Sequence, residues 1–327
     1  MEFLMLLWLG KPVWMWLAFM GLVAALLALD LGVLHRKSRE IGVKESLMLS
    51  AFYIVLGLAF SGFVWWQLGE TAAINYVTGF VVEKSLAMDN VFVIAMIFTY
   101  FAIPRQYQHR VLFWGILGVI VLRAIMIALG ATIVSEFGWV LYLFAAFLIF
   151  TGIKMWRMVD TPYDVANSPL LGWLKRHMRV TDGLRGSAFF VQEPDAKTGT
   201  MVRHATPLFL ALVMIEFADL VFAVDSVPAI FAITTDPFIV YTSNIFAILG
   251  LRALYFALSA LVDRFHYLKY ALAVLLVFIG SKIFVADALG LAKIPPVVSL
   301  GITALILTTG VVYSLWRTRN APTPSLT

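Results

Sequence analysis

Cysteine is absent from the 327 residues of this chain, and charged residues are scarce, at 13%. Without cysteine the chain cannot form disulfide bonds, thiolate-bound metal sites or cysteine-ligated clusters. A soluble domain carries about 25% charged residues, so the low share argues against a soluble protein. The five histidines are predicted in or beside loops, which argues against a buried haem or zinc site held by histidine pairs.

The chain is rich in apolar residues, with 62% hydrophobic residues and a mean hydropathy of +0.93. These values are typical of an integral membrane protein with many spans, so we expect the lipid bilayer to be a partner. The N-terminus lacks the basic region and cleavage site of a removable signal peptide, so we expect the first span to be retained. The net charge of +5 is spread over many connections, which argues against a nucleic-acid partner.

Apolar stretches that cross a bilayer need about 20 residues. By this criterion the sequence predicts an all-α polytopic membrane protein with nine transmembrane helices. The predicted spans are 13–33, 47–69, 75–102, 110–134, 138–158, 205–233, 241–262, 266–287 and 295–316. The chain is then a single transmembrane transport domain over residues 1–320, followed by a disordered tail, 321–327.

Basic residues gather in every second connection between the predicted spans. The first connection holds Arg36 and Lys37, and the long fifth connection, 159–204, holds Lys175 among several others, whereas the even connections contain a single lysine, Lys293. Cytoplasmic loops carry the excess of lysine and arginine. The pattern therefore predicts an external N-terminus, a cytoplasmic C-terminus and a cytoplasmic 159–204 connection.

The cytoplasmic connection is the one sizeable segment predicted outside the membrane. Residues 169–179 mix apolar and basic side chains, which predicts a short helix on the anionic membrane surface. Two short apolar runs flank the turn-rich residues 193–199, and this pattern predicts a small β-hairpin.

Two parts of the chain, about 75–158 and 205–287, repeat the same polar residues in the same order. Asp89 precedes Arg123 and a Gly-x-Lys motif at 152–154, and Asp219 precedes Arg252 and a Gly-x-Lys motif at 280–282. Each part contains three predicted spans, an odd number, so the second would be inserted upside down relative to the first. Inverted repeats place a substrate site near the midplane of the membrane.

The sixth span carries three acids and a proline near its middle. Glu216, Asp219 and Asp225 lie in an otherwise apolar stretch, where ionisable groups are costly and mark an ion or substrate path. Pro228 cannot donate to the carbonyl of residue 224, so we expect the helix to be unwound or kinked there. A break of this kind would re-aim Asp225 and let Asp89, Asp219 and Asp225 share one cavity.

Carboxylate, amide and hydroxyl groups at membrane depth are the ligands that Mg²⁺, Ca²⁺ and Mn²⁺ prefer. The third span adds acids and an amide to those of the sixth. The candidate metal ligands are Glu83, Asp89, Asn90, Glu216, Asp219, Asp225 and Ser226.

Several other charged residues are candidates for supporting or charge-pairing roles. Arg123 and Arg252 are expected to meet acids, either as structural partners or as cations that hold the carboxylates once a metal has left. Lys84 follows Glu83 and is assigned a supporting or charge-pairing role. Asp30 lies late in the first span, where a helix cap and a ligand are equal alternatives.

Two long motifs resemble a known family. Residues 83–92 (EKSLAMDNVF) and 219–229 (DLVFAVDSVPA) are similar to the TerC family, in particular to its Alx-type members, and the likeness runs from about residue 25 to about 316. The resemblance implies a bacterial inner-membrane protein of manganese homeostasis that exports Mn²⁺. It also implies core polar positions at Asp89, Asn90, Asp219, Asp225 and Ser226.

The favoured function is a secondary transporter that exports a divalent cation, Mn²⁺ ahead of Mg²⁺ and Ca²⁺, with protons or another counter-ion moving inward at the same acids. The alternative is a non-transporting membrane sensor or scaffold linked to tellurite or pH stress. An enzyme is not expected, because the spans offer no nucleophile–base pair, and neither is a prosthetic group. The sequence leaves the oligomeric state open.

Overall fold

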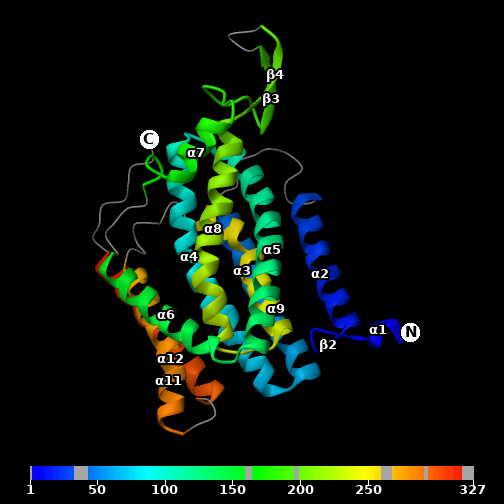
Figure 1. Ribbon diagram of the computed structural model, residues 1–327, viewed down its shortest axis with the longest axis vertical. Helices are drawn as coiled ribbons and strands as arrows, with labels where there is room; N and C mark the ends of the chain where they lie inside the picture. The colour runs from blue at the N-terminus through cyan, green and yellow to red at the C-terminus, as the bar shows by residue number, and fades with distance from the viewer. Residues whose placement is uncertain are drawn as a thin grey trace.

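The computed structural model describes residues 2–32, 43–158, 164–194, 199–258, 267–290 and 294–318. The elements form a helical bundle with two small hairpins (Figure 1). The helices are α1 (Glu2–Met5), α2 (Val13–Gly32), α3 (Val43–Leu68), α4 (Glu70–Tyr100), α5 (Arg105–Glu136), α6 (Val140–Arg157), α7 (Pro169–His177), α8 (Pro207–Phe231), α9 (Pro237–Leu249), α10 (Leu251–Leu258), α11 (Leu268–Ala288) and α12 (Pro296–Arg317). The strands are β1 (Leu7–Trp8), β2 (Lys11–Pro12), β3 (Phe190–Pro194) and β4 (Met201–Ala205), and they pair antiparallel as β1–β2 and β3–β4.

Within these described ranges, seven helices are long and apolar enough to cross a membrane: α3, α5, α6, α8, the α9–α10 pair, α11 and α12. The predicted all-α, multi-span class is therefore confirmed. Helix α4 is not among the seven, since Glu83, Lys84 and Asp89 interrupt its apolar run, and α2 has a shorter apolar stretch. The count of nine spans and their orientation in the membrane stay predictions.

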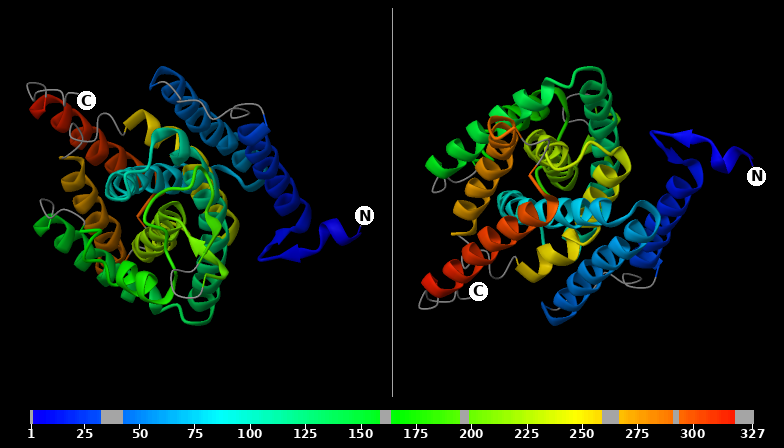
Figure 2. Two further views of the ribbon diagram at one scale, coloured as in Figure 1. Left: turned by 90° about the horizontal axis from the view of Figure 1, so that it is seen from above. Right: turned by 90° about the horizontal axis from the view of Figure 1, so that it is seen from below.

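Helices α4, α5, α8 and α9 form the centre of the bundle (Figures 1 and 2). Helix α4 packs against α8 and α9, and α5 packs against the same two helices. The α9–α10 stretch is buried throughout the window that would cross the membrane. Helices α2 and α3 lie on one flank of this centre, and α6, α11 and α12 lie on the opposite flank (Figure 2). The helices that carry Glu83, Arg123 and Asp219 are thus surrounded by other helices.

Helices α6 and α11 approach each other closely through two glycines. A Cβ on Gly152 would lie 2.7 Å from the carbonyl oxygen of Ala273, and a Cβ on Gly280 would lie 2.5 Å from that of Ala145. The two contacts are reciprocal, since Gly280 and Ala273 are the repeat partners of Gly152 and Ala145. Small residues of this kind let two membrane helices bring their backbones together.

The predicted helix and hairpin of the 159–204 connection are both confirmed. Helix α7 starts at Pro169 and buries Leu171 and Leu174, while Trp173 stays exposed. The β3–β4 hairpin contacts the bundle through the rings of Phe190 and Phe209, whose centroids are 4.4 Å apart. In Figure 1 both elements lie at the end of the bundle opposite the turn between α11 and α12.

The prediction that the sixth span unwinds at Pro228 is wrong. Helix α8 runs through this proline to Phe231, and the N–H of Ala232 donates to the Pro228 carbonyl at 2.9 Å. Proline removes only one hydrogen bond, and here it lies in the last turn of a helix that is buried on this side. The break in a buried span occurs instead at Gly250, between α9 and α10.

The reciprocal glycine contacts predict the effect of a single methyl group. Gly152→Ala should force α6 and α11 apart, because the new Cβ would meet a backbone carbonyl that cannot rotate away; overpacking of this kind costs about 1–3 kcal/mol. We expect a lower apparent Tm for the purified protein in detergent. The control is Gly62→Ala on α3, where an added Cβ meets nothing within 4 Å. Equal unfolding temperatures for the two variants would contradict the contact.

Candidate functional site

Arg123, on α5, lies at the centre of the bundle with 1% of its surface exposed. Its Nε and Nη2 donate to the two carboxylate oxygens of Asp219 on α8, at 3.3 and 3.1 Å. Its Nη1 donates to the Glu83 carboxylate on α4. One guanidinium therefore joins acids from two helices that are far apart in the sequence.

The remaining contacts of this guanidinium are to neutral groups. Nη1 also donates to the Asn244 side-chain oxygen on α9 at 2.8 Å and to the Ser226 hydroxyl on α8 at 3.1 Å. The Asn90 amide on α4 donates to Asp219 at 3.1 Å. All six side chains are buried. We call them the Arg123 cluster: Glu83, Asn90, Arg123, Asp219, Ser226 and Asn244.

The Arg123 cluster satisfies the conditions under which charges can be buried. An isolated charge costs several kcal/mol to remove from water, and the cost falls only when oppositely charged groups and hydrogen bonds surround it. Arg123 has both acids and two neutral acceptors, and each of its three nitrogens donates to at least one of them. The prediction that Arg123 meets an acid is confirmed.

A small cavity of about 20 Å³ lies on one side of this cluster. Such a volume holds about one water-sized body. The polar groups on its wall come from Arg123 and from five of the predicted metal ligands: Glu83, Asp89, Asn90, Asp225 and Ser226. The structure thus brings Asp89 and Asp225 to one cavity, as the sequence predicted, without a break in α8.

A second cavity of about 20 Å³ lies next to the first and is lined by Asn90, Asp219 and Arg252 together with apolar side chains. Asn90 contributes to both walls, and its side-chain oxygen accepts no hydrogen bond from the described residues. The prediction of a single cavity for Asp89, Asp219 and Asp225 is therefore wrong for Asp219. Its carboxylate turns toward Arg123 and Asn90 instead.

Two acids of the first cavity, Asp225 and Asp89, each also have a lysine nearby. Thr151 on α6 hydrogen-bonds Asp225, and Lys154 on the same helix attracts it. Lys269 on α11 attracts Asp89. The two lysines come from α6 and α11, the two helices that pack through the reciprocal glycines.

Glu216 does not complete the site. It lines neither small cavity, and its carboxylate lies against Gly118 on α5, where there is no room for a side chain. One of its buried oxygens has no hydrogen-bond partner among the described residues. The helix explains this position, because Glu216 lies about 180° around α8 from Asp225 when no break intervenes.

Lys84 supports the broken span. Its buried ammonium donates to the Ala247 carbonyl at 3.0 Å, at the end of α9, and a Cβ on Gly250 would lie 2.8 Å from the same nitrogen. A cation at the carbonyl end of a helix is favourable. Because this contact is to a backbone carbonyl and not to an acid, it favours the supporting role of Lys84 over charge pairing. Asp30 belongs to the last turn of α2, and its side chain lies outside the described residues.

No group of three or more His, Asp or Glu side chains in the described part of the chain is arranged to hold a metal ion. The Arg123 cluster gives the reason. Glu83 and Asp219 point at the guanidinium, which occupies the place between them, and Asp89 and Asp225 remain at the first cavity. In this conformation the arginine is the cation of the site.

Sequence reasoning gave no role to Asn244, which the structure places in contact with Arg123. The available signal was a wholly buried amide within an apolar span, together with the nearby glycine that ends α9.

The sequence matches the description "Integral membrane protein TerC family" over residues 68–321, which include every member of the Arg123 cluster. This chain belongs to the TerC family. Relatives cover almost all of it. A protein from Salmonella typhi named "Putative membrane-bound redox modulator Alx" is 46% identical over 94% of this chain and 95% of its own.

Two further relatives have names that state no function. An uncharacterized membrane protein from Rickettsia bellii is 46% identical over 92% of this chain and 97% of its own. Another, from Myxococcus xanthus, is 45% identical over 96% of this chain and 95% of its own. No solved structure matches the chain. The TerC resemblance in the motifs at 83–92 and 219–229 is thus confirmed over most of the sequence.

Removing Arg123 alone should destabilise the protein more than removing Arg123 together with its two acidic partners. Arg123→Met leaves Glu83 and Asp219 buried without their cation, and breaking a buried ion pair in this way costs about 3–5 kcal/mol. We expect a large fall in Tm in detergent, and partial recovery when Glu83→Gln and Asp219→Asn are added. Arg105→Met, at an exposed position of α5, is the control. An Arg123→Met protein as stable as this control would contradict the cluster.

Proposed function

We propose that this TerC-family protein is a secondary transporter that exports a divalent metal cation, with Mn²⁺ as the favoured substrate. The observation that carries the proposal is the small cavity beside the Arg123 cluster, in which Asp89 and Asp225 meet Asn90, Ser226 and Glu83. These groups offer only oxygen ligands, which suit Mn²⁺, Mg²⁺ and Ca²⁺. The choice of Mn²⁺ and of export comes from the family resemblance.

Arg123 would stabilise the proposed transporter in the state that has no bound metal. A carrier must return without its cargo, and unpaired carboxylates inside a bundle would oppose that step. Here Arg123 already forms ion pairs with both Glu83 and Asp219 and so offsets part of their negative charge. A divalent cation that enters between Asp89 and Asp225 would compete with the arginine for Glu83 and would push the guanidinium toward Asp219. The two cations would then occupy the site alternately.

The contact between α6 and α11 supports the inverted repeat, and the count of nine spans remains part of the proposal. Gly152 and Gly280 make equivalent contacts across the α6–α11 pair, as two repeat units related by a two-fold axis would do. We place the substrate site between these units, and protons or another counter-ion would return through the same carboxylates. The three relatives named above are bacterial, which is compatible with the inner membrane as the location.

The name of the Salmonella relative favours a second candidate, a membrane protein that influences redox state without moving metal. The 327 residues contain no cysteine, so thiol–disulfide exchange by this chain's own side chains is excluded. A redox or stress effect would then have to pass through a bound ion or another protein. A sensor or scaffold of that kind does not need Asp89 and Asp225 to lie in one cavity.

Removing one charge from the cavity should stop export. Asp89→Asn and Asp225→Asn keep the side-chain size but remove a carboxylate ligand, and we expect each to reduce Mn²⁺ efflux from preloaded cells at least tenfold. The matched control is Glu136→Gln at the exposed end of α5. Asp236, which the sequence places in an external loop, is a poorer control because it caps α9 and pairs with Lys11 at 2.8 Å.

All variants should reach the membrane in equal amounts, measured by immunoblot. Efflux at the parent rate by both Asp89→Asn and Asp225→Asn would place the substrate site elsewhere and refute the proposal.

A further inference from the structure

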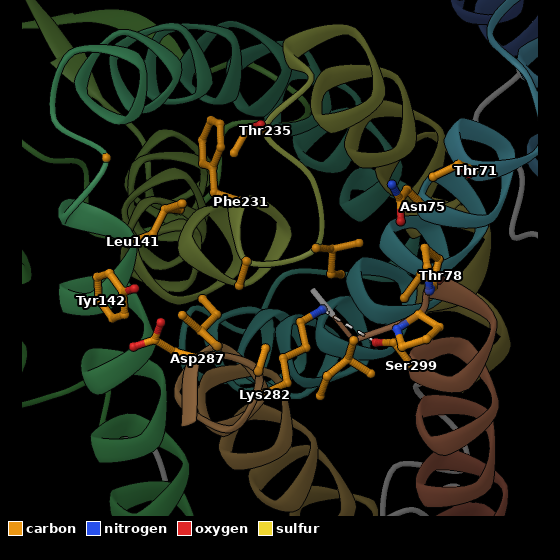
Figure 3. A pocket seen from close by; sticks show the side chains of 18 residues that line it. Thr71, Asn75, Thr78, Leu141, Tyr142, Phe231, Thr235, Lys282, Asp287 and Ser299 are labelled. Atoms are coloured by element: carbon orange, nitrogen blue, oxygen red, sulfur yellow. Dashed lines mark hydrogen bonds between the residues drawn. The ribbon is translucent and has the colours of Figure 1, made fainter. Parts of the chain in front are cut away.

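A much larger cavity, of about 490 Å³, lies at the end of the bundle away from α7 and the β3–β4 hairpin. Its wall includes residues at or beside four connections: Thr71 at the start of α4, Gly138 between α5 and α6, Thr235 between α8 and α9, and Ile294 before α12. These are the connections that the charge pattern places outside the cell. We call this cavity the vestibule (Figure 3).

One lysine projects into the vestibule. Lys282 on α11 is half-buried, and its ammonium lies 3.5 Å from the Ser299 hydroxyl on α12. Figure 3 shows Lys282 reaching across the cavity toward Ser299, while Asp287 is turned toward Tyr142. Lys282 thus lies on the side of the vestibule nearer the small cavity. Asp287 lies farther along α11, where it is exposed.

The vestibule and the small cavity at Asp89 and Asp225 are stacked along three helices. On α4 Thr78 lines the vestibule and Glu83 lines the small cavity. On α8 the corresponding pair is Phe231 and Ser226. On α11 it is Lys282 and Leu276. The separation along each helix axis is five or six residues, or about 8–9 Å.

Along these helices, a layer of apolar residues lies between the levels of the two cavities. Val82, Ala229 and Ile279 lie between the paired residues on α4, α8 and α11, each is buried, and all three belong to one hydrophobic cluster. A desolvated cation cannot cross such a layer without a large loss of hydration free energy. The path from the small cavity to the vestibule is therefore closed in this conformation.

We propose that the vestibule is the external mouth of the cation path, that Val82, Ala229 and Ile279 form its closed gate, and that Lys282 lowers the affinity of this mouth for divalent cations. The inference rests on the proposed function. Because Lys282 repels the cation that has just been released, re-entry from outside is disfavoured. A charge of +1 about 8 Å from a divalent cation in a water-like medium weakens the binding of that cation about fivefold.

The absence of native cysteine permits a direct test of the vestibule by single-cysteine labelling. Asn75→Cys places a thiol on the vestibule wall, and Ile279→Cys places one in the buried layer. Membrane-impermeant methanethiosulfonates, one bearing a sulfonate and one bearing a trimethylammonium group, are applied from the external side. Each labelling rate is divided by the rate at which the same reagent reacts with a free thiol in solution.

We expect Asn75→Cys to react from the external side and to react faster with the anionic reagent. Adding Lys282→Met to the same chain should remove this preference. Ile279→Cys should not react. Two results would overturn the proposal: labelling of Asn75→Cys only from the cytoplasmic side, or an equal reagent preference with and without Lys282. This arm does not depend on transport.

The second arm measures how external Mn²⁺ inhibits Mn²⁺ efflux. Lys282→Met should be inhibited at about fivefold lower external Mn²⁺ than the parent, and Lys282→Arg, which keeps the charge, should behave as the parent. Parent and Lys282→Met with the same inhibition would overturn the role of Lys282 while the transporter proposal stands. A parent protein that moves no Mn²⁺ would overturn both the proposed function and this role, whatever the labelling shows.

Discussion

The ion pairs that Arg123 makes with Glu83 and Asp219 are the interaction on which the rest of the structure depends. They bring α4, α5 and α8 together at the most polar point of an apolar bundle, and Asn244 adds α9. Because unpaired charges are so costly at this depth, the three helices cannot move independently. The cavity with Asp89 and Asp225 exists because this cluster fixes the faces that α4 and α8 present to each other.

Much of this organisation could be predicted from the sequence. The apolar segments gave helices at nearly the observed bounds, and the order of Asp, Arg and Gly-x-Lys residues pointed to Gly152 and Gly280, which do make equivalent contacts. Acids in an apolar stretch have few partners available, so the pairing of Arg123 with acids also followed. Local composition alone was enough for α7 and the β3–β4 hairpin.

Other features depend on packing between helices, and the sequence could not supply them. A proline in the last turn costs one hydrogen bond, which burial of the surrounding helix outweighs, so α8 stays intact at Pro228. At the break at Gly250, the last turn of α9 accepts a hydrogen bond from Lys84, which is more than 160 residues away in the chain. The separation of Asp219 from Asp225 likewise follows from which side of α8 faces Arg123.

We propose that the oxygen ligands beside Arg123 carry a divalent cation across the membrane. The most direct measurement is Mn²⁺ flux into sealed liposomes that contain only the purified protein, followed with a trapped Mn²⁺-sensitive dye, with and without an imposed pH gradient. We expect saturable Mn²⁺ uptake that exceeds the leak of protein-free liposomes and that responds to the pH gradient. Uptake no faster than this leak under either condition, from protein shown to be folded, would contradict the proposal.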